Sequence, residues 1–196
     1  MAVRLPASER RRQLLDTALE VFGAHGFHGA SMNQVAEAAG VTKPVLYQHF
    51  RSKRALYREL LDDVADRLAL AVVEATGEAG SPHRQVQLGL RTYFTFVHGN
   101  RAAFRLMFGS GTRRDPEFAE VVTRVEDMIA EAVADLIVVP GMARASRLLL
   151  GYAIVGMSEG TSRHWSENGF EPSPEELAEL VAELAWAGLR GLRPET

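Results

Sequence analysis

Apolar residues recur every three or four positions along almost the whole chain, and no segment alternates apolar and polar residues as a strand does. The clearest stripe consists of Phe118, Val121, Val122, Val125, Met128, Ile129, Val133 and Leu136. Residues at this spacing share one face of a helix. Glycine and proline separate the stripes, so the sequence predicts an all-α fold of about nine helices and no sheet. The stretch 109–114 is predicted to be a flexible loop.

Residues 31–50 contain two short amphipathic segments separated by Gly40. Ser31 and Gln34 have the spacing of a capping box, in which each side chain bonds the backbone of the other residue at the start of a helix. Gly40 stands where the first segment ends, and glycine readily adopts the left-handed backbone that such an ending needs. The stretch therefore predicts a helix, a tight turn and a second helix.

The second helix of this pair is expected from about Thr42 to Phe50. Either Thr42 or Lys43 can cap it, because Pro44 disfavours a helical conformation at the residue before it. The positions expected inside are Val41, Leu46 and Phe50. The positions expected outside are Lys43, Val45, Tyr47, Gln48 and His49. An outward face of cation, aromatic ring, amide and imidazole suits a phosphate-lined groove.

Positive charge is concentrated near the N-terminus, although the whole chain carries a net charge of −3. Residues 1–60 hold nine Lys or Arg against five Asp or Glu, whereas residues 61–196 hold thirteen against twenty. A basic N-terminal part fits an electrostatic footprint for nucleic acid. The run Arg10-Arg11-Arg12 opens a predicted helix, and we interpret it either as a phosphate contact or as a flexible, solvated arm.

The composition narrows the remaining classes of function. The chain of 196 residues has no cysteine, which excludes disulfides and thiolate metal sites. We expect a cytoplasmic protein, because no secretory leader is present and the longest nearly apolar run, residues 148–157, is too short to cross a bilayer. The sequence has no G-x-S-x-G elbow, H-E-x-x-H pair or Walker loop, so we predict no catalytic site, no metal and no cofactor.

With these elements in place, the N-terminal part resembles the TetR family of transcriptional regulators over about residues 10–57. The motifs that carry the resemblance are Gly26-Phe27, Ser31, Val35-Ala36-Glu37-Ala38-Ala39-Gly40-Val41, Leu46-Tyr47-Gln48-His49-Phe50, Ser52-Lys53 and Leu56. The chain departs from the family pattern at Ser31, where threonine is commoner. It also departs at Pro44 and Val45, where many members have small residues, and these two changes bear on base preference more than on docking.

The resemblance implies a helix-turn-helix DNA-binding domain over residues 1–51 and a helical ligand-binding and dimerisation domain over residues 52–196. On the family's pattern, the helix from about Thr42 enters the major groove. The residues then placed at base edges are Lys43, Pro44, Val45 and Gln48. Gln48 also suits a phosphate. The residues that resemble the family's phosphate contacts are Ser31, Thr42, Tyr47, His49 and Lys53.

The family binds a palindromic operator as a homodimer, and the C-terminal part offers apolar surface for that pairing. The run from Leu148 to Met157 has no polar side, so we expect every side of this helix to be covered. The core of one chain covers one side only, which leaves another side for a second chain. The candidate interface residues are Gly151, Val155, Gly156, Leu180, Leu184 and Gly188. The alternative is that these helices simply close the core of a monomer.

The C-terminal part also looks like actinobacterial TetR-type regulators of fatty acid synthesis that respond to long-chain acyl-CoA. The segments that carry this likeness are Tyr93-Phe94, Phe104-Arg105-Leu106-Met107-Phe108, Val155-Gly156-Met157-Ser158 and Leu184-Ala185-Trp186-Ala187-Gly188-Leu189. It implies a small apolar or acyl-CoA-like effector. The candidate ligand-binding residues, chosen for aromatic and methionine surface, are Phe94, Phe104, Met107, Phe108, Met128, Tyr152, Met157 and Trp165. The alternative is that this stripe is ordinary core.

Together these expectations describe a ligand-responsive regulator, a repressor first and an activator as the alternative. The ligand would displace the helix expected over residues 52–75 and change the separation of two DNA-reading heads. An enzyme is one competing class, and its only support is the six histidines among many serines and carboxylates. A helical protein-interaction module is the other, and the basic face of residues 43–54 argues against it.

Overall fold

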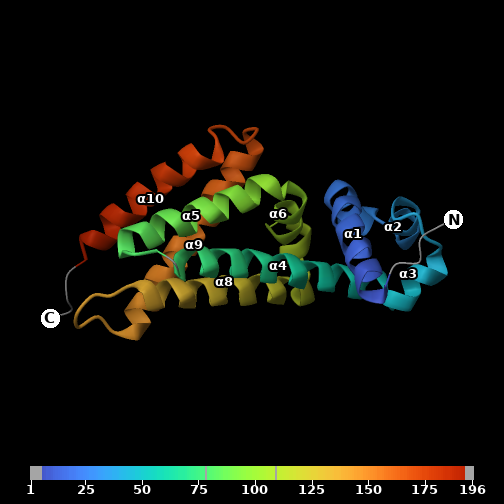
Figure 1. Ribbon diagram of the computed structural model, residues 1–196, viewed down its shortest axis with the longest axis horizontal. Coiled ribbons are helices and arrows are strands. Elements are labelled where there is room, and N and C mark those ends of the chain that lie inside the picture. Colours follow the sequence, from blue (N-terminus) through green and yellow to red (C-terminus); the bar gives the residue numbers. More distant parts are fainter. Residues whose placement is uncertain (1–5, 78, 109, 193–196) are drawn as a thin grey trace. The chain divides into compact units, whose positions relative to one another are not determined.

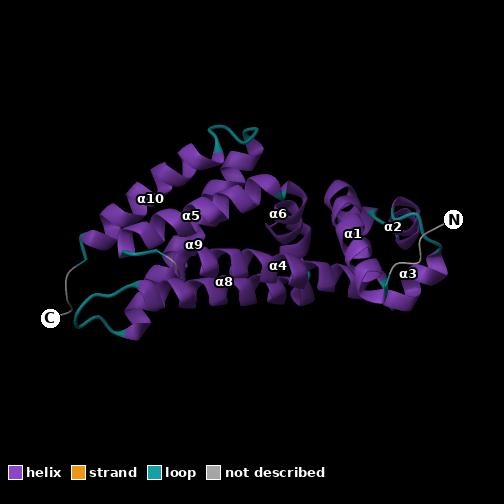
Figure 2. Cartoon of the chain, in the orientation of Figure 1, coloured by secondary structure: helices purple, strands orange, loops and turns teal. Residues whose placement is uncertain are grey.

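The computed structural model describes residues 6–77, 79–108 and 110–192, and every regular element in these ranges is an α-helix (Figures 1 and 2). The helices are α1 (Ala7–Gly29), α2 (Met32–Ala38), α3 (Lys43–His49), α4 (Lys53–Gly77), α5 (Pro82–Gly99), α6 (Arg101–Phe108), α7 (Ser110–Arg114), α8 (Pro116–Leu136), α9 (Arg144–Glu167) and α10 (Pro174–Arg190). The predicted all-α fold class is confirmed. The predicted flexible loop over residues 109–114 is wrong where the structure describes it, because residues 110–114 form the short helix α7. Gly109 lies outside the described residues.

The helices group into two compact units that are not continuous in sequence. The first comprises residues 1–64 and 101–122, and the second comprises residues 65–100 and 123–196. This division differs from the predicted boundary between residues 51 and 52. The difference arises because α6, α7 and the first turns of α8 pack with the N-terminal helices, a long-range association that no local sequence pattern reveals.

In the first unit, α1 packs against both α2 and α6. A Cβ at Gly23 would lie 2.6 Å from the Cβ of Ala102, so glycine is required where α1 meets α6. α1 is interrupted at Gly26, whose φ of 67° only glycine adopts readily. The turn that follows places the Phe27 ring 4.9 Å from Tyr57 and 5.0 Å from Phe118, measured between ring centroids.

In the second unit, α5 packs along α10 and also contacts α9. The predicted capping box of α10 is confirmed, since Ser173 Oγ accepts from the backbone of Glu176 at 3.3 Å. α9 buries one face, on which Trp165 is almost fully covered, whereas Leu149 on another face is 71% exposed. The apolar run of α9 is therefore covered on one side only in the single chain.

Two negative findings apply to the described ranges. None of the helices there is both long enough and apolar enough to cross a membrane. The same ranges contain no group of three or more His, Asp or Glu side chains placed to hold a metal ion.

Candidate nucleic-acid interface

The pair α2–α3 forms through the local interactions that its sequence predicts. Ser31 Oγ accepts from the backbone of Gln34 at 3.3 Å, and the backbone of Ser31 donates to Gln34 Oε1 at 2.8 Å, so the capping box is confirmed. Gly40 has a φ of 64° in the turn after α2. Thr42 occupies the position before α3 with an extended backbone, but its side chain makes no capping hydrogen bond.

The buried side of α3 anchors it in the first unit and leaves its polar side in solvent. Leu46 and Phe50 are buried as predicted, whereas Val41 is half-buried. Tyr47 is 43% exposed. The other exposed candidates are Thr42, Lys43, Pro44 and Gln48, and the half-buried ones are Ser31, Val45, His49 and Lys53. The exposed face of α3 thus presents a cation, an aromatic ring and an amide to solvent.

Arg11 of α1 holds the C-terminal end of α3, a role that was not predicted. Its Nη1 donates to the backbone carbonyl of His49 at 2.8 Å, its guanidinium bonds Glu59 of α4, and Cζ lies 4.5 Å from the centroid of the Phe50 ring. A cation at a helix C-terminus is favourable because the last carbonyls there are unpaired and partly negative. Arg11 therefore fixes the end of the helix that carries Tyr47 and Gln48.

Arg10 and Arg12 also form polar contacts within the first unit. The run Arg10-Arg11-Arg12 is therefore not fully described as a phosphate contact or as a flexible, solvated arm. Arg10 Nη1 donates to Gln13 Oε1 at 2.6 Å. Arg12 pairs with Asp63 of α4 at 2.6 Å and with Asp16 at 3.0 Å. The ion pair between Arg12 and Asp63 could not be predicted from local sequence patterns, because the two residues are fifty-one positions apart.

Lys53 at the start of α4 is bound to its own protein. Its Nζ donates to the carbonyl of Phe27 at 2.7 Å and to that of Ala30 at 2.9 Å, and it lies 4.5 Å from the centroid of the Phe27 ring. These are the carbonyls at the end of α1, directly before α2. Lys53 thus tethers the turn that enters the helix-turn-helix, and a phosphate contact by the same ammonium stays a prediction.

Arg54, next in sequence, joins α4 to the start of α8 inside the first unit. It bonds Asp115 at 2.6 Å and also bonds Glu117, and its guanidinium lies 4.7 Å from the centroid of the Phe118 ring. The hydrogen bonds from Arg54 hold the pKa of both carboxyl groups below their usual range. Both therefore remain charged near neutral pH and keep Arg54 in place.

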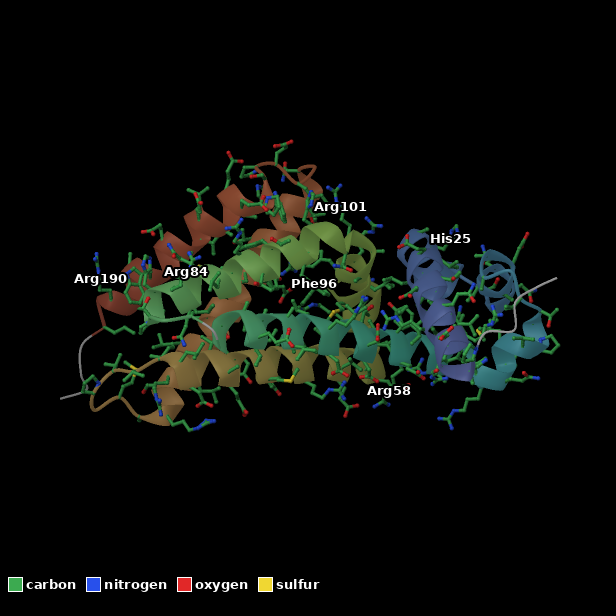
Figure 3. All side chains as sticks on the ribbon, viewed as in Figure 1. His25, Arg58, Arg84, Phe96, Arg101 and Arg190 are labelled. Carbon is green, nitrogen blue, oxygen red and sulfur yellow. The ribbon has the colours of Figure 1, made fainter. Side chains whose placement is uncertain are left out.

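A hollow of about 820 Å³ lies beside the end of α3 and the start of α4, within the first unit. Its lining includes Tyr47, Gln48, Arg51 and Arg58, of which Arg58 is labelled in Figure 3. Arg51 is exposed directly after α3, and we did not single it out from the sequence, although a cation at this place is the kind of residue that meets a DNA phosphate.

The predicted ligand-binding residues are divided between the two units, and their role in binding an effector stays a prediction. Phe104, Met107 and Phe108 belong to the first unit, and the other five belong to the second. Within the second unit, Phe94 and Trp165 are buried and pack edge to face with centroids 6.0 Å apart. Met128 and Tyr152 are 41% and 40% exposed, and the Tyr152 hydroxyl donates to Asp127 at 2.5 Å. These two residues lie on the surface of the unit. Their exposure could not be predicted, because helical spacing alone does not say which neighbour an apolar stripe faces.

The predicted interface residues also divide. Leu180 and Leu184 of α10 are 66% and 65% exposed, and their place in an interface between chains stays a prediction. Gly156 and Gly188 are exposed too, and Val155 is half-buried. Gly151 is buried, and a Cβ there would overlap the carbonyl oxygen of Ala130, so the close approach that it permits is between α9 and α8 of the same chain. A place for Gly151 in an interface between chains stays a prediction, to which this contact within the chain lends no support.

Two family models match most of this chain. Residues 14–60 match the model described as bacterial regulatory proteins, tetR family, and residues 82–188 match the model described as tetracyclin repressor-like, C-terminal domain. The HTH-type transcriptional activator FasR of Mycolicibacterium smegmatis is 34% identical over 187 residues, which cover 95% of this chain and 85% of FasR. The HTH-type transcriptional regulator RutR of Escherichia coli is 40% identical over 75 residues, covering 38% of this chain and 35% of RutR.

Solved structures share the fold over nearly the whole chain. A TetR-like transcriptional regulator from Rhodococcus sp. RHA1 is similar with a TM-score of 0.79 and 29% identity, covering 96% of this chain and 100% of that one. FadR from Bacillus subtilis, solved in complex with stearoyl-CoA, is similar with a TM-score of 0.79 over 90% of this chain and 98% of FadR. At 18% identity, the likeness to FadR shows the fold alone.

Proposed function

The chain belongs to the TetR family of bacterial regulatory proteins, and from that premise we propose that it binds a palindromic DNA operator as a homodimer and responds to an apolar or fatty-acyl effector. Proteins of this family are ligand-responsive DNA-binding regulators and not enzymes.

The observation that carries the DNA part is the exposed side of α3. Lys43, Tyr47 and Gln48 are in solvent while Leu46 holds the helix in the core, so the three polar side chains are available to a groove. Lys43 can donate to guanine O6 or N7, and the apolar Pro44 can meet a thymine methyl group. Tyr47 suits a phosphate oxygen, which sets the register of the helix but carries no sequence information.

The pairing part is supported by the exposed leucines of α10. Leu180 and Leu184 lie one helical turn apart, so they form a continuous apolar strip together with the exposed Gly188. One helix-turn-helix binds one half-site of an operator. Two copies related by a twofold axis bind a palindrome whose half-sites lie one or two DNA turns apart, about 34–36 Å per turn. We therefore place the dimer contact on α10 and the exposed side of α9.

The effector part is supported by the buried aromatic pair Phe94 and Trp165 in the second unit. FasR, to which the chain is similar along most of its length, is named an activator, and the FadR structure contains stearoyl-CoA. Repression with release on effector binding remains our first proposal. Activation is the second candidate, which the name of FasR favours.

Salt dependence of binding to a palindrome from the chain's own promoter tests the DNA part. A dimer that contacts six to ten phosphates should lose about 10³- to 10⁵-fold in affinity between 50 and 200 mM salt. Fluorescence anisotropy with a labelled duplex measures this, and a scrambled duplex of equal length is the control. A flat response to salt would favour a protein-interaction module instead. Mass spectrometry of small molecules that copurify with the protein tests the effector part, and recovery of polar molecules alone would contradict it.

A further inference from the structure

The hollow beside the end of α3 and the start of α4 is continuous with the exposed side of α3. Tyr47 and Gln48 belong both to that exposed side and to the lining of the hollow, whose volume is about 820 Å³. All of its lining residues lie in the first unit. When a helix lies in the major groove, the phosphate strand that borders the groove passes beside it. A duplex read by α3 would therefore bring one strand to this hollow.

Three of the four cations between residues 51 and 58 are engaged with their own protein. Lys53 donates to two backbone carbonyls at the end of α1. Arg54 pairs with Asp115 at 2.6 Å and also with Glu117. Arg58 lines the hollow, and its Nη1 lies 3.4 Å from Oε1 of the same Glu117. A cation that already has an anionic or carbonyl partner attracts a phosphate less strongly, because its charge is partly offset.

Arg51 is the exception among these four cations. It is exposed, it lines the hollow, and it makes neither a hydrogen bond nor an ion pair with any residue in the ranges that the structure describes. It follows α3 directly and lies four positions after Tyr47. Its guanidinium is therefore available to an anion that reaches the end of α3.

The carboxylates that line the hollow leave this positive end uncompensated. Glu59 bonds Arg11 of α1, and Glu117 bonds Arg54. Asp62 lies nine positions into α4, roughly 13 Å along the helix from its first residue. The hollow thus has its available positive charge next to α3 and its carboxylates further along α4 or already paired.

We propose that this hollow receives one phosphate group of the operator backbone, with the Arg51 guanidinium as its ionic partner and the Tyr47 hydroxyl as a second donor. A guanidinium suits this role because it can present two parallel N–H donors to one phosphate. The inference rests on the proposed function, since it requires that α3 reads a duplex. It assigns to Arg51 the ionic contact that the family pattern places at Lys53.

The salt dependence of DNA binding tests Arg51 against Lys53. Binding of a labelled palindromic duplex from the chain's own promoter is followed by fluorescence anisotropy between about 50 and 200 mM salt. Arg51→Ala should weaken binding about tenfold or more and lower the slope of log affinity against log salt by about one for each chain of the dimer. Arg51→Lys should restore the slope, because it keeps the charge. Lys53→Ala should keep the slope of the parent protein.

A pair of substitutions at Ala55 tests the hollow itself. Ala55 lines the hollow at the third position of α4, and its backbone N–H donates to Ser52 Oγ at 3.0 Å. A helix that opens with such a serine cap accepts either Glu or Gln at this position. Ala55→Glu places a negative charge at the hollow, and Ala55→Gln has nearly the same shape without the charge. We expect Ala55→Glu to bind the duplex about tenfold more weakly than Ala55→Gln.

Arg105→Ala is the matched control for Arg51→Ala, because Arg105 is an exposed arginine of the same unit that does not line the hollow. It should keep the slope of the parent protein. A scrambled duplex of equal length gives the second control, since loss of a phosphate contact should weaken binding to both duplexes by the same factor. The Ala55 pair decides alone should Arg51→Ala not fold, as circular dichroism shows.

The outcomes separate this inference from the proposed function. If the parent protein has a steep slope that Arg51→Ala retains, or if the two Ala55 variants bind alike, the inference is overturned while the proposed function stands. Unequal losses for the two duplexes in Arg51→Ala would mean that Arg51 reads a base edge, which also overturns it. A flat salt response of the parent protein would refute the proposed function and the inference together.

Discussion

Lys43 and Lys53 have the same side chain and were both expected to meet DNA, but their surroundings differ. Lys43 is exposed at the first position of α3, whereas Lys53 gives its ammonium to two carbonyls at the end of α1. A lysine exposed to solvent is available to a base edge. A lysine that hydrogen-bonds two backbone carbonyls contributes first to the stability of the protein.

Alanine substitutions should separate these two roles. Lys43→Ala should change the sequence preference of binding with little effect on stability, because it removes a candidate base contact. Lys53→Ala should lower the free energy of unfolding by roughly 1–2 kcal/mol, since two charge-assisted hydrogen bonds are lost. Urea unfolding measures stability, and binding to a panel of duplexes with single base changes measures preference. Unchanged stability in Lys53→Ala would mean that its two backbone bonds contribute nothing and that a phosphate is its main partner.

At the scale of elements, the orientation of α3 depends on a side chain from α1. Arg11 bonds the His49 carbonyl at the end of α3 and Glu59 of α4, and it covers the Phe50 ring. A guanidinium can do all three because it is planar and has several fixed donors. A lysine at this position would keep the charge and lose that geometry.

Arg11 should therefore act on DNA binding by positioning α3 and not by meeting a phosphate. We expect Arg11→Ala and Arg11→Lys each to weaken operator binding by roughly threefold to tenfold, as loss of about one net hydrogen bond implies. The slope of log affinity against log salt should stay at the value of the parent protein, because no phosphate contact is removed. Rescue by lysine together with a slope reduced by about one in Arg11→Ala would identify a direct phosphate contact instead.

The packing of α9 on α8 depends on one glycine. A Cβ at Gly151 would overlap the Ala130 carbonyl oxygen, whereas a Cβ at Gly160 on the same helix would meet nothing within 4 Å outside the nearby backbone of that helix. Gly151→Ala should lower the free energy of unfolding by about 1–3 kcal/mol through overpacking. Gly160→Ala should be neutral or raise it by about 0.5–1 kcal/mol, because alanine favours a helix. Thermal unfolding followed by circular dichroism measures both, and equal losses in the two variants would refute this account of Gly151.

At the scale of the whole molecule, operator binding is expected to require two chains. Lysine at both Leu180 and Leu184 places charge on the proposed contact and should yield a monomer by light scattering. Operator affinity should then fall by about 10²-fold or more, because the second half-site is no longer tethered to the first. Val138→Lys is the matched control, since Val138 is 82% exposed outside the proposed contact. A double variant that remains dimeric would move the interface away from α10.

The sequence by itself determined most of the helices and several of their ends, although not α7, because capping boxes, left-handed glycines and apolar spacing act over only a few residues. Ser31 with Gln34, Gly40 and Ser173 with Glu176 behave in the structure as their local patterns predict. The exposed side of α3 was predictable for the same reason, since Leu46 and Phe50 fix which side of a short helix is inside.

Only the tertiary structure decided which residues far apart in sequence meet. Residues 101–122 pack in the N-terminal unit. Arg11 and Lys53 donate to backbone carbonyls, and Gly151 packs against Ala130 of the same chain. The physical reason is that helical periodicity states which side of a helix is apolar, whereas the partner of that side is chosen by long-range packing of the whole chain.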